Sequence, residues 1–380
     1  DILPSTQNYW QFVRDTVERC SDLFGYNRID TPAFEDTRLF LRTVGSETDI
    51  VQKEMYSFMD RGGQDLTLRP EGTAAVCRAY IEHGMSNEPQ PVRLYYISPM
   101  FRYDRPQAGR YRQHHQFGVE AIGDSDPVVD AEIIQLAVHS VSSLGLSGVG
   151  LVLNTIGDLS GRPIYLQALH DYYTPFKDSL CDDCARRHVE HPLRLLDCKN
   201  HQCQRFLESA PKSSDFLGKE AQEHWNSLLR YLDGAGVSYR LDHRLVRGLD
   251  YYSRTVFELQ PAEEGAQSSI AAGGRYDGLI QQLGGQSVPG IGFAMGLERV
   301  IRNLEEQGVN VPDLGIPPVV VVHNGPDAKQ EAFLLTARLR KLGMKLVIAP
   351  TRSLRAQMRF ASSLNAPHVL IIGPDELEKQ

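Results

Sequence analysis

The chain lacks any apolar run long enough to span a membrane, and no signal peptide is visible. It also lacks an excess of positive charge: its net charge is -8, so any binding of nucleic acid must use local basic patches. Cysteine is scarce, and six cysteines without a secretion signal indicate a reducing, cytoplasmic location. The glycine spacings of Rossmann and P-loop sites are missing as well. These absences favour a globular protein of two or three domains that does not act in a membrane.

One segment, residues 98–120, concentrates positive charge. Its arginines surround a Pro-Gln-Ala-Gly turn, and its flanks, residues 92–97 and 113–120, alternate like two strands. A guanidinium can donate two parallel hydrogen bonds to phosphate oxygens. The segment therefore predicts a hairpin whose loop binds polyphosphate. A solvated charged loop is the alternative, but few acids balance the arginines, which are Arg102, Arg105, Arg110 and Arg112.

Hydrophobic spacing predicts helices over residues 8–24, 71–83 and 126–144, and a hairpin over 50–70. Strand patterns vanish between 158 and 236, which predicts a helical insertion. They return from Tyr239, over 241–246, 251–259 and 269–273, and a strand enters a helix over 290–300. After a proline-rich linker at 312–318, a βαβαβ order predicts a separate small sheet.

These patterns predict an α+β protein with four segments. Residues 1–157 and 237–311 form the two parts of a core, and residues 158–236 form the helical insertion between them. Residues 317–380 form a C-terminal α/β domain. We expect this domain to be incomplete and the natural N-terminus to be absent, since the sequence begins with Asp1 and stops soon after the last strand.

Three further segments combine polar residues with glycine. Glu71 and Thr73 stand at a helix start, where a carboxylate either caps the helix or joins the threonine in holding a substrate ammonium. Arg247 precedes Gly248, where backbone can approach a ligand closely. The glycines of 271–278 and 290–299 leave room for a flat ring or a phosphate beside bare backbone, with Arg299 one turn into a helix.

Together these segments resemble the bacterial-type histidyl-tRNA synthetases, which are class II aminoacyl-tRNA synthetases. The resemblance covers the whole chain and rests on residues 68–74, 101–113, 247–252, 273–279 and 292–299. Residues 101–113 resemble class II motif 2 and residues 292–299 resemble motif 3, whereas Arg-Gly-Leu-Asp-Tyr-Tyr at 247–252 is specific to the histidine enzyme. The resemblance implies an antiparallel sheet flanked by helices and a C-terminal anticodon-binding domain.

The resemblance also implies the reaction: L-histidine and ATP form histidyl-adenylate, and the histidyl group passes to the 3′ end of tRNA(His), with Mg²⁺ on the triphosphate. Arg102 and Arg247 would be catalytic, stabilising charge as the bond forms. The implied ATP-binding residues are Arg102, Arg110, Arg112 and Arg299. The implied histidine-binding residues are Glu71, Gly72, Thr73, Gln116, Glu120, Tyr251, Tyr252 and Tyr276, with Glu120 and Tyr252 reaching the imidazole nitrogens.

Two positions depart from the commonest family pattern: Asp104 replaces a glutamate and His114 a phenylalanine. The alternative function is that of the synthetase-like regulatory subunit of ATP phosphoribosyltransferase. That paralogue generally loses catalytic residues and the anticodon-binding domain. Because Arg102, Arg247 and the C-terminal domain are present, the sequence favours the enzyme.

Three expectations concern partners and metals. Cys181, Cys184, Cys198 and Cys203 have a spacing that fits a structural zinc site, although four free thiols are the alternative.

Residues 317–380 hold nine Lys or Arg and five Asp or Glu, and this local positive charge suits the phosphates of RNA. Arg352, Arg355 and Arg359 are expected on one helix near the anticodon stem. The helix leading into Ile29-Asp-Thr-Pro32 resembles motif 1, which implies a homodimer.

Overall fold

The computed structural model describes residues 1–43, 48, 50–104, 111–158, 160–249, 251–261, 269–313 and 317–379. The chain divides into two compact units, Asp1–Asn310 and Val311–Gln380. Each unit has its own sheet and its own hydrophobic core. In the described part of the chain, no helix is both long and apolar enough to cross a membrane.

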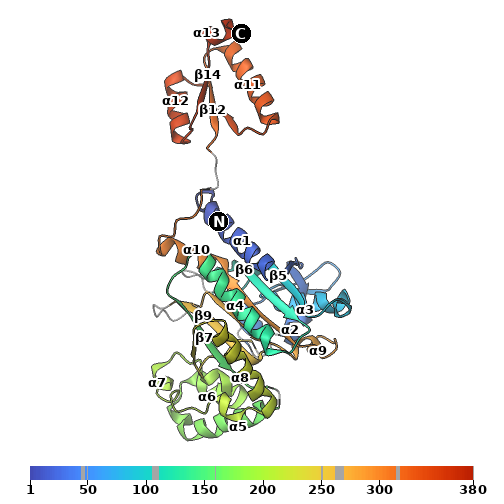
Figure 1. Ribbon diagram of the computed structural model, residues 1–380. Helices are drawn as coiled ribbons and strands as arrows, with labels where there is room; N and C mark the ends of the chain where they lie inside the picture. The colour runs from blue at the N-terminus through green and yellow to red at the C-terminus, as the bar shows by residue number, and fades with distance from the viewer. Residues whose placement is uncertain are drawn as a thin grey trace. The chain divides into compact units, whose positions relative to one another are not determined.

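An eight-stranded sheet organises the first unit (Figure 1). Its strand order is β1-β5-β6-β11-β10-β9-β7-β8. The inner pairs are antiparallel, as predicted, whereas β1 with β5 and β7 with β8 make parallel edges. The strands are β1 (Asn27–Arg28), β5 (Val92–Phe101), β6 (Gln113–Ile122), β7 (Val149–Thr155), β8 (Tyr239–Leu241), β9 (Ser253–Pro261), β10 (Ala271–Arg275) and β11 (Gly290–Gly296).

Helices cover both faces of this sheet. One face packs against α1 (Gln7–Leu23), α4 (Pro127–Ser143), α8 (Lys219–Gly234) and α10 (Leu297–Glu306), and apolar residues of all four helices join one buried core. α3 (Thr73–Glu82) and the short α9 (Leu279–Gln282) pack with the other face, where the core contains several tyrosines. Alternation along β6 explains the division: Val119 and Ala121 enter the first core, and Ile122 enters the second.

A smaller antiparallel sheet in the same unit has the order β2-β4-β3, with β2 (Phe34–Asp36), β3 (Tyr56–Met59) and β4 (Asp65–Leu68), and α2 (Thr37–Thr43) follows β2. Phe34 pairs with Leu68 and Phe58 pairs with Leu66, so both phenylalanines lie on one face of this sheet. Both side chains are exposed. On the opposite face, the buried Thr67 hydroxyl bonds to those of Thr37 and Ser57.

The described residues of the insertion form helices joined by turns and loops, with no strand among them, as predicted. It contains α5 (Arg162–Tyr173), α6 (Asp182–Glu190) and α7 (His201–Gln204), whose apolar residues share a core between Tyr165 and Ala210. The following helix, α8, contributes Trp225 and Leu228 to the main core instead. The packing therefore places α8 with the sheet, although sequence composition groups it with the insertion.

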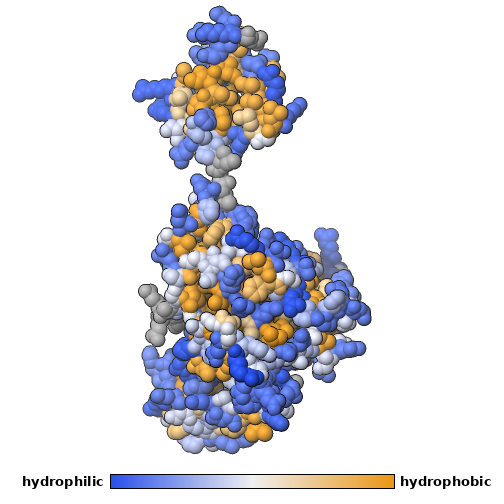
Figure 2. Space-filling model, viewed as in Figure 1, coloured by the Kyte–Doolittle hydropathy of each residue, from blue (hydrophilic) through white to orange (hydrophobic). Residues whose placement is uncertain are grey.

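The C-terminal unit has the predicted βαβαβ order, and its three strands are parallel in the order β13-β12-β14. Its elements are β12 (Val319–His323), α11 (Pro326–Lys341), β13 (Leu346–Ile348), α12 (Leu354–Ser363), β14 (Val369–Ile372) and α13 (Pro374–Glu378). Buried valines of β12 enter cores on both faces of the sheet. In Figure 2 apolar side chains also gather on the visible surface of this unit, and Phe333, Leu342 and Ile371 are among its exposed residues.

The sequence prediction of the fold was wrong at three places. The hairpin predicted over 50–70 begins only at β3, because Ile50–Glu54 form a π-helical turn. Residues 241–246 are not a strand: pairing with β7 ends at Leu241, and Asp242 turns the chain by accepting hydrogen bonds from the backbone and side chain of Arg244. Arg352 lies before α12, so only Arg355 and Arg359 belong to that helix. Other predictions fall outside the described residues: Asp250, the hairpin loop at 105–110 with Arg105 and Arg110, and part of the linker.

Candidate active site

A cleft of about 1710 Å³ lies between the tyrosine-bearing face of the large sheet and the insertion. Most of the residues predicted for the site line it. They lie at or just before the start of α3, directly after β5, on β6, in the loop before β9, directly after β10 and near the start of α10. The predicted residues on its wall are Glu71, Thr73, Arg102, Gln116, Arg247, Tyr251, Tyr252, Tyr276 and Arg299.

Glu120 of β6 lies directly behind this wall and is almost completely buried. Thr73 donates a hydrogen bond to one carboxylate oxygen over 2.7 Å, and Tyr276 donates to the other over 2.5 Å. The pKa of Glu120 is raised to about 8. Burial is the largest cause of this rise, the two hydroxyl donors partly oppose it, and nearby Glu71 adds to it. A carboxyl group in this setting gains stability from any further positive or N–H partner that enters the pocket.

Glu71 lies two residues before α3, and its carboxylate accepts hydrogen bonds from the backbone N–H groups of Thr73 and Ala74 at 2.7 and 3.0 Å. The capping alternative from the sequence is therefore confirmed. Capping does not exclude ligand binding, because a carboxylate has further acceptor sites and Glu71 faces the cleft. Burial raises the pKa of Glu71 as well, against the opposing effect of its backbone donors.

Aromatic rings and one amide complete the pocket. The rings of Tyr251 and Tyr252 lie 4.7 Å apart, and Tyr276 meets Tyr251 edge to face at 6.0 Å. The side-chain oxygen of Gln116 is buried and has no hydrogen-bond partner among the described residues. An unpaired buried acceptor is costly, so this oxygen is suited to a donor on a bound molecule.

Glycines make room for these side chains. A Cβ at Gly72 would lie 2.3 Å from the Tyr96 ring, and one at Gly292 would lie 2.0 Å from a carboxylate oxygen of Glu120. A Cβ at Gly290 would lie 2.3 Å from the Tyr276 ring. From sequence, the glycines of 290–299 are expected to leave space for a ring or phosphate of the ligand. Beside Gly290 and Gly292, the protein's own Tyr276 and Glu120 take that space.

The predicted arginines differ in their surroundings. Arg247 forms an ion pair with Glu258, and its guanidinium lies 5.9 Å from the centre of the Tyr252 ring. Arg102 donates to the Pro70 carbonyl at 2.8 Å, and Arg299 donates to the Ser269 carbonyl. These three line the cleft. Arg112 does not: its guanidinium lies over the Tyr103 ring at 4.5 Å, and Arg110 lies outside the described residues.

Sequence reasoning gave no site role to three residues on this wall. Tyr96 lies on the cleft between Gly72 and Gly118, but a tyrosine in an alternating strand is typical of ordinary core. Glu258 holds Arg247, and only the fold shows that pairing. His114 faces the cleft, where burial and then the charge of Arg102 lower its pKa to about 4 and keep the imidazole neutral.

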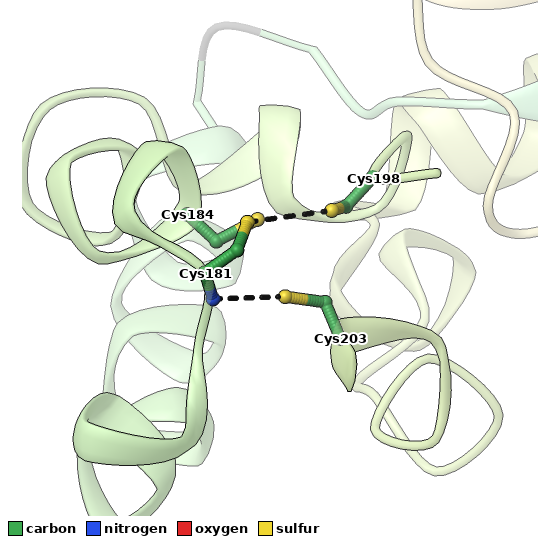
Figure 3. Close-up of side chains that lie close together, drawn as sticks. All are labelled: Cys181, Cys184, Cys198 and Cys203. Carbon is green, nitrogen blue, oxygen red and sulfur yellow. Dashed lines mark hydrogen bonds between the residues drawn. The ribbon is translucent and has the colours of Figure 1, made fainter. Parts of the chain in front are cut away.

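The four cysteines of the insertion come together as their spacing predicted. Their sulfur atoms all lie within 4.8 Å of one another, on the insertion side of the cleft (Figure 3). All six cysteines of the chain are free of disulfides. Thiolate sulfur is a ligand for Zn²⁺, so this cluster can hold a metal of that kind.

Comparison with protein families gives a match to the histidyl-tRNA synthetase model over residues 1–159 and 181–300. A curated histidine–tRNA ligase from Dehalococcoides mccartyi is 52% identical over 380 residues, which cover 100% of this chain and 91% of the relative. The corresponding ligase from Desulforamulus reducens is 48% identical, with the same coverage.

Solved structures give the same result. The crystal structure of apo histidyl-tRNA synthetase from Staphylococcus aureus matches with a TM-score of 0.83 and 39% identity, over 100% of this chain and 91% of that one. A Bacillus halodurans structure titled ATP phosphoribosyltransferase regulatory subunit/histidyl-tRNA synthetase matches with a TM-score of 0.69 over 98% of this chain and 96% of that one. At 22% identity, it shows the fold alone.

Proposed function

Since the chain belongs to the histidyl-tRNA synthetase family and is a histidine–tRNA ligase, we propose that the pocket around Glu120 binds the histidine substrate. The enzyme activates L-histidine with ATP to histidyl-adenylate and transfers the histidyl group to the 3′ end of tRNA(His). Glu120 accepts a hydrogen bond from one imidazole nitrogen, and the hydroxyl of Tyr252 forms a hydrogen bond with the other. Glu71, Thr73 and Gln116 hold the α-ammonium, while Gly72, Tyr251 and Tyr276 shape the pocket.

The observation that carries this assignment is the set of partners around Glu120. In the described structure it is buried with two hydroxyl donors and no basic partner, which explains its raised pKa. An imidazole N–H supplies the missing donor, and the neutral ring needs one donor and one acceptor. A pocket of buried polar groups also rejects amino acids that leave those groups unpaired.

The arginines of the cleft stabilise phosphate charge. Arg102 contacts the α-phosphate and Arg247 lies between that phosphate and the histidine carboxylate, where negative charge develops as the bond forms. Arg299 binds at the adenine or the γ-phosphate, and Arg110 and Arg112 act near the triphosphate. Mg²⁺ enters with ATP and neutralises the outer phosphates. Zn²⁺, bound by the thiols of the insertion, is a second metal with a structural role.

Histidine-dependent ATP–pyrophosphate exchange tests the pocket and the arginines together. Arg247→Ala should lower exchange by about 100-fold or more, because one charge-stabilising donor contributes about 3 kcal/mol to the transition state. Arg302→Ala is the control, since Arg302 is exposed on α10 and pairs with Glu306 one turn away. A folded wild-type protein without histidine-dependent exchange would instead favour the regulatory paralogue.

The C-terminal unit is proposed to bind the anticodon arm of the tRNA. Arg352, Arg355 and Arg359 are all exposed, with the latter two one turn apart on α12. Substituting all three with alanine should weaken tRNA binding and reduce its dependence on salt concentration. The control replaces Lys329, Arg338 and Lys341 of α11, which removes the same charge. An equal salt slope in both variants would contradict a specific role for α12.

We also propose a homodimer, which acts in the cytoplasm where tRNA is charged for translation. The exposed apolar face of the β2-β4-β3 sheet, with Phe34 and Phe58, supports an interface in the first unit. Replacing both phenylalanines with glutamate should shift sedimentation toward the monomer. Val189→Glu, at an exposed apolar residue of the insertion, is the control. A monomeric wild type, or a dimer that survives the double change, would refute this interface.

A further inference from the structure

The four cysteines of the insertion come from two short segments with the same design. Cys181 immediately precedes α6, and Cys184 lies in its first turn. Cys198 lies in the loop before α7, and Cys203 lies within that helix. Each segment thus places one cysteine before a helix and one inside it. Figure 3 shows the two pairs approaching a common space from different parts of the chain.

The sulfur positions fit a tetrahedral metal site. All four Sγ atoms lie within 4.8 Å of one another, and those of Cys181 and Cys198 are 3.9 Å apart. A Zn–S bond of about 2.3 Å places the sulfurs of a regular tetrahedron about 3.8 Å apart. A disulfide requires about 2.05 Å between sulfurs, and all four cysteines are free. The cluster therefore has the dimensions of a metal site before any metal is added.

Backbone amides point at two of these sulfurs. The N–H of Cys181 donates to Sγ of Cys203 over 3.3 Å, and the N–H of Asn200 donates to Sγ of Cys198 over 3.4 Å. Such donors stabilise thiolate, the form of cysteine that binds metal, and they orient each sulfur. A cluster of thiols that served only as apolar filling would have no need of these contacts.

The packing of the insertion indicates that a metal bound by the four cysteines would stabilise its small core. Its buried apolar cluster contains Cys184, Cys198 and Cys203, so sulfur makes up part of the small core itself. Small cores are marginal, and a structural metal is a common way to stabilise them. Four protein ligands also leave no open position for a substrate, which separates a structural zinc site from a catalytic one.

We propose that Cys181, Cys184, Cys198 and Cys203 bind one Zn²⁺ ion as four thiolates, and that this ion fixes the insertion's wall of the cleft. Binding replaces the thiol protons by the metal, so protons are released and no electron is transferred. Cys181 and Cys198 line the cleft together with Arg187, Arg194 and Lys199. On the proposed function, the 3′ end of the tRNA must enter this cleft to meet the adenylate. The wall that borders its path carries charges of both signs, because Asp182, Asp183 and Asp197 line the cleft there as well.

Metal analysis of the purified full-length protein tests the site itself. We expect about one zinc per chain, as four thiolates make one tetrahedral site. Cys198→Ser with Cys203→Ser should lose the zinc, whereas Cys20→Ala, at a buried cysteine of the main core, should keep it. A second test needs no variant, because Cys198 and Cys203 belong to the core of the insertion: a mercurial titration of the wild type should release zinc as these thiols react. Zinc-free wild type, or iron in its place, would overturn the proposal.

Activity assays on the same preparations test the role of the wall. Zinc release should expose the insertion to protease and should raise the KM for tRNA in charging at least severalfold. Histidine-dependent ATP–pyrophosphate exchange, which needs no tRNA, should change less. Equal losses in both assays, or no change in protease sensitivity, would overturn the wall role. Bound zinc in a protein that shows no exchange would contradict the ligase activity and support the metal site. Exchange by a protein that binds no zinc would support the ligase activity and contradict the metal site.

Discussion

Two buried carboxylates of the first unit, Asp130 and Glu120, have opposite electrostatic settings. Burial would raise the pKa of Asp130, but the charge of Arg275 and a hydrogen bond with His224 outweigh it and lower this pKa to about 2. At Glu120 the partners are the hydroxyls of Thr73 and Tyr276, and its pKa rises to about 8. The partner of a buried acid, more than its burial, therefore decides whether the acid is structural or available to a ligand.

The two carboxylates are joined through neighbouring residues of one segment. Arg275 ends β10 and donates to Asp130 of α4 over 3.0 Å, while the next residue, Tyr276, donates to Glu120. Asp130 also accepts from Thr255 of β9 over 2.6 Å. The ion pair therefore fixes the strand end from which Tyr276 reaches the pocket. Its role at the site is to position Tyr276.

Breaking the structural pair should have the largest effect. Arg275→Met leaves Asp130 buried without its cation, and loss of one partner from a buried ion pair costs about 3–5 kcal/mol. We expect a loss of this order in the free energy of unfolding, measured by urea denaturation. The double variant Arg275→Met with Asp130→Leu should recover part of it, since no buried charge remains unpaired. A single variant as stable as wild type would contradict the structural assignment.

Changing the carboxylate of the pocket should affect activity more than stability. Glu120→Gln keeps the shape but weakens acceptance of an imidazole N–H, and we expect kcat/KM for histidine in the exchange assay to fall about 100-fold, or about 2.7 kcal/mol. Tyr276→Phe, which removes one donor to Glu120, should give a smaller loss. An unchanged kcat/KM in Glu120→Gln would remove this residue from the histidine pocket.

The two acids should also give opposite pH dependences of stability. The pKa of Glu120 is raised from 4.5 to about 8, so the ligand-free protein loses stability from this group as pH rises through that interval. The pKa of Asp130 is lowered from 3.8 to about 2, so its contribution is present above the upper value and is lost as pH falls through the lower one. Unfolding free energies against pH for Glu120→Gln and wild type should diverge toward pH 8. Parallel curves would contradict the raised pKa.

The smallest effect is expected at an exposed ion pair. Arg302 and Glu306 are one turn apart on α10 and both are open to solvent, so screening leaves their attraction weak. Glu306→Gln should leave unfolding and exchange unchanged within experimental error. A loss comparable with that of Arg275→Met would show that burial does not control the strength of ion pairs in this protein.

Much of the fold follows from local patterns in the sequence. The helices α1, α3 and α4, the β5–β6 hairpin and the C-terminal βαβαβ unit all have clear hydrophobic periodicity and end signals. Residues 241–246 alternate like a strand but do not form one, because Asp242 accepts hydrogen bonds from Arg244 and the chain turns there. Tyr96 was likewise missed, because its alternation in β5 is the same for a core residue as for a pocket residue.

Local sequence patterns identify the chemical groups of this protein: arginines for phosphate, carboxylates and tyrosines for the histidine pocket, and two cysteine pairs at a spacing that fits zinc. How these groups are used depends on the way the chain folds. The fold placed Arg275 beside Asp130, left Glu120 with hydroxyl partners, set Gly292 against that carboxylate and brought the cysteine pairs together. The physical reason is that charge state and ligand binding depend on distances between residues far apart in the chain, which no local pattern records.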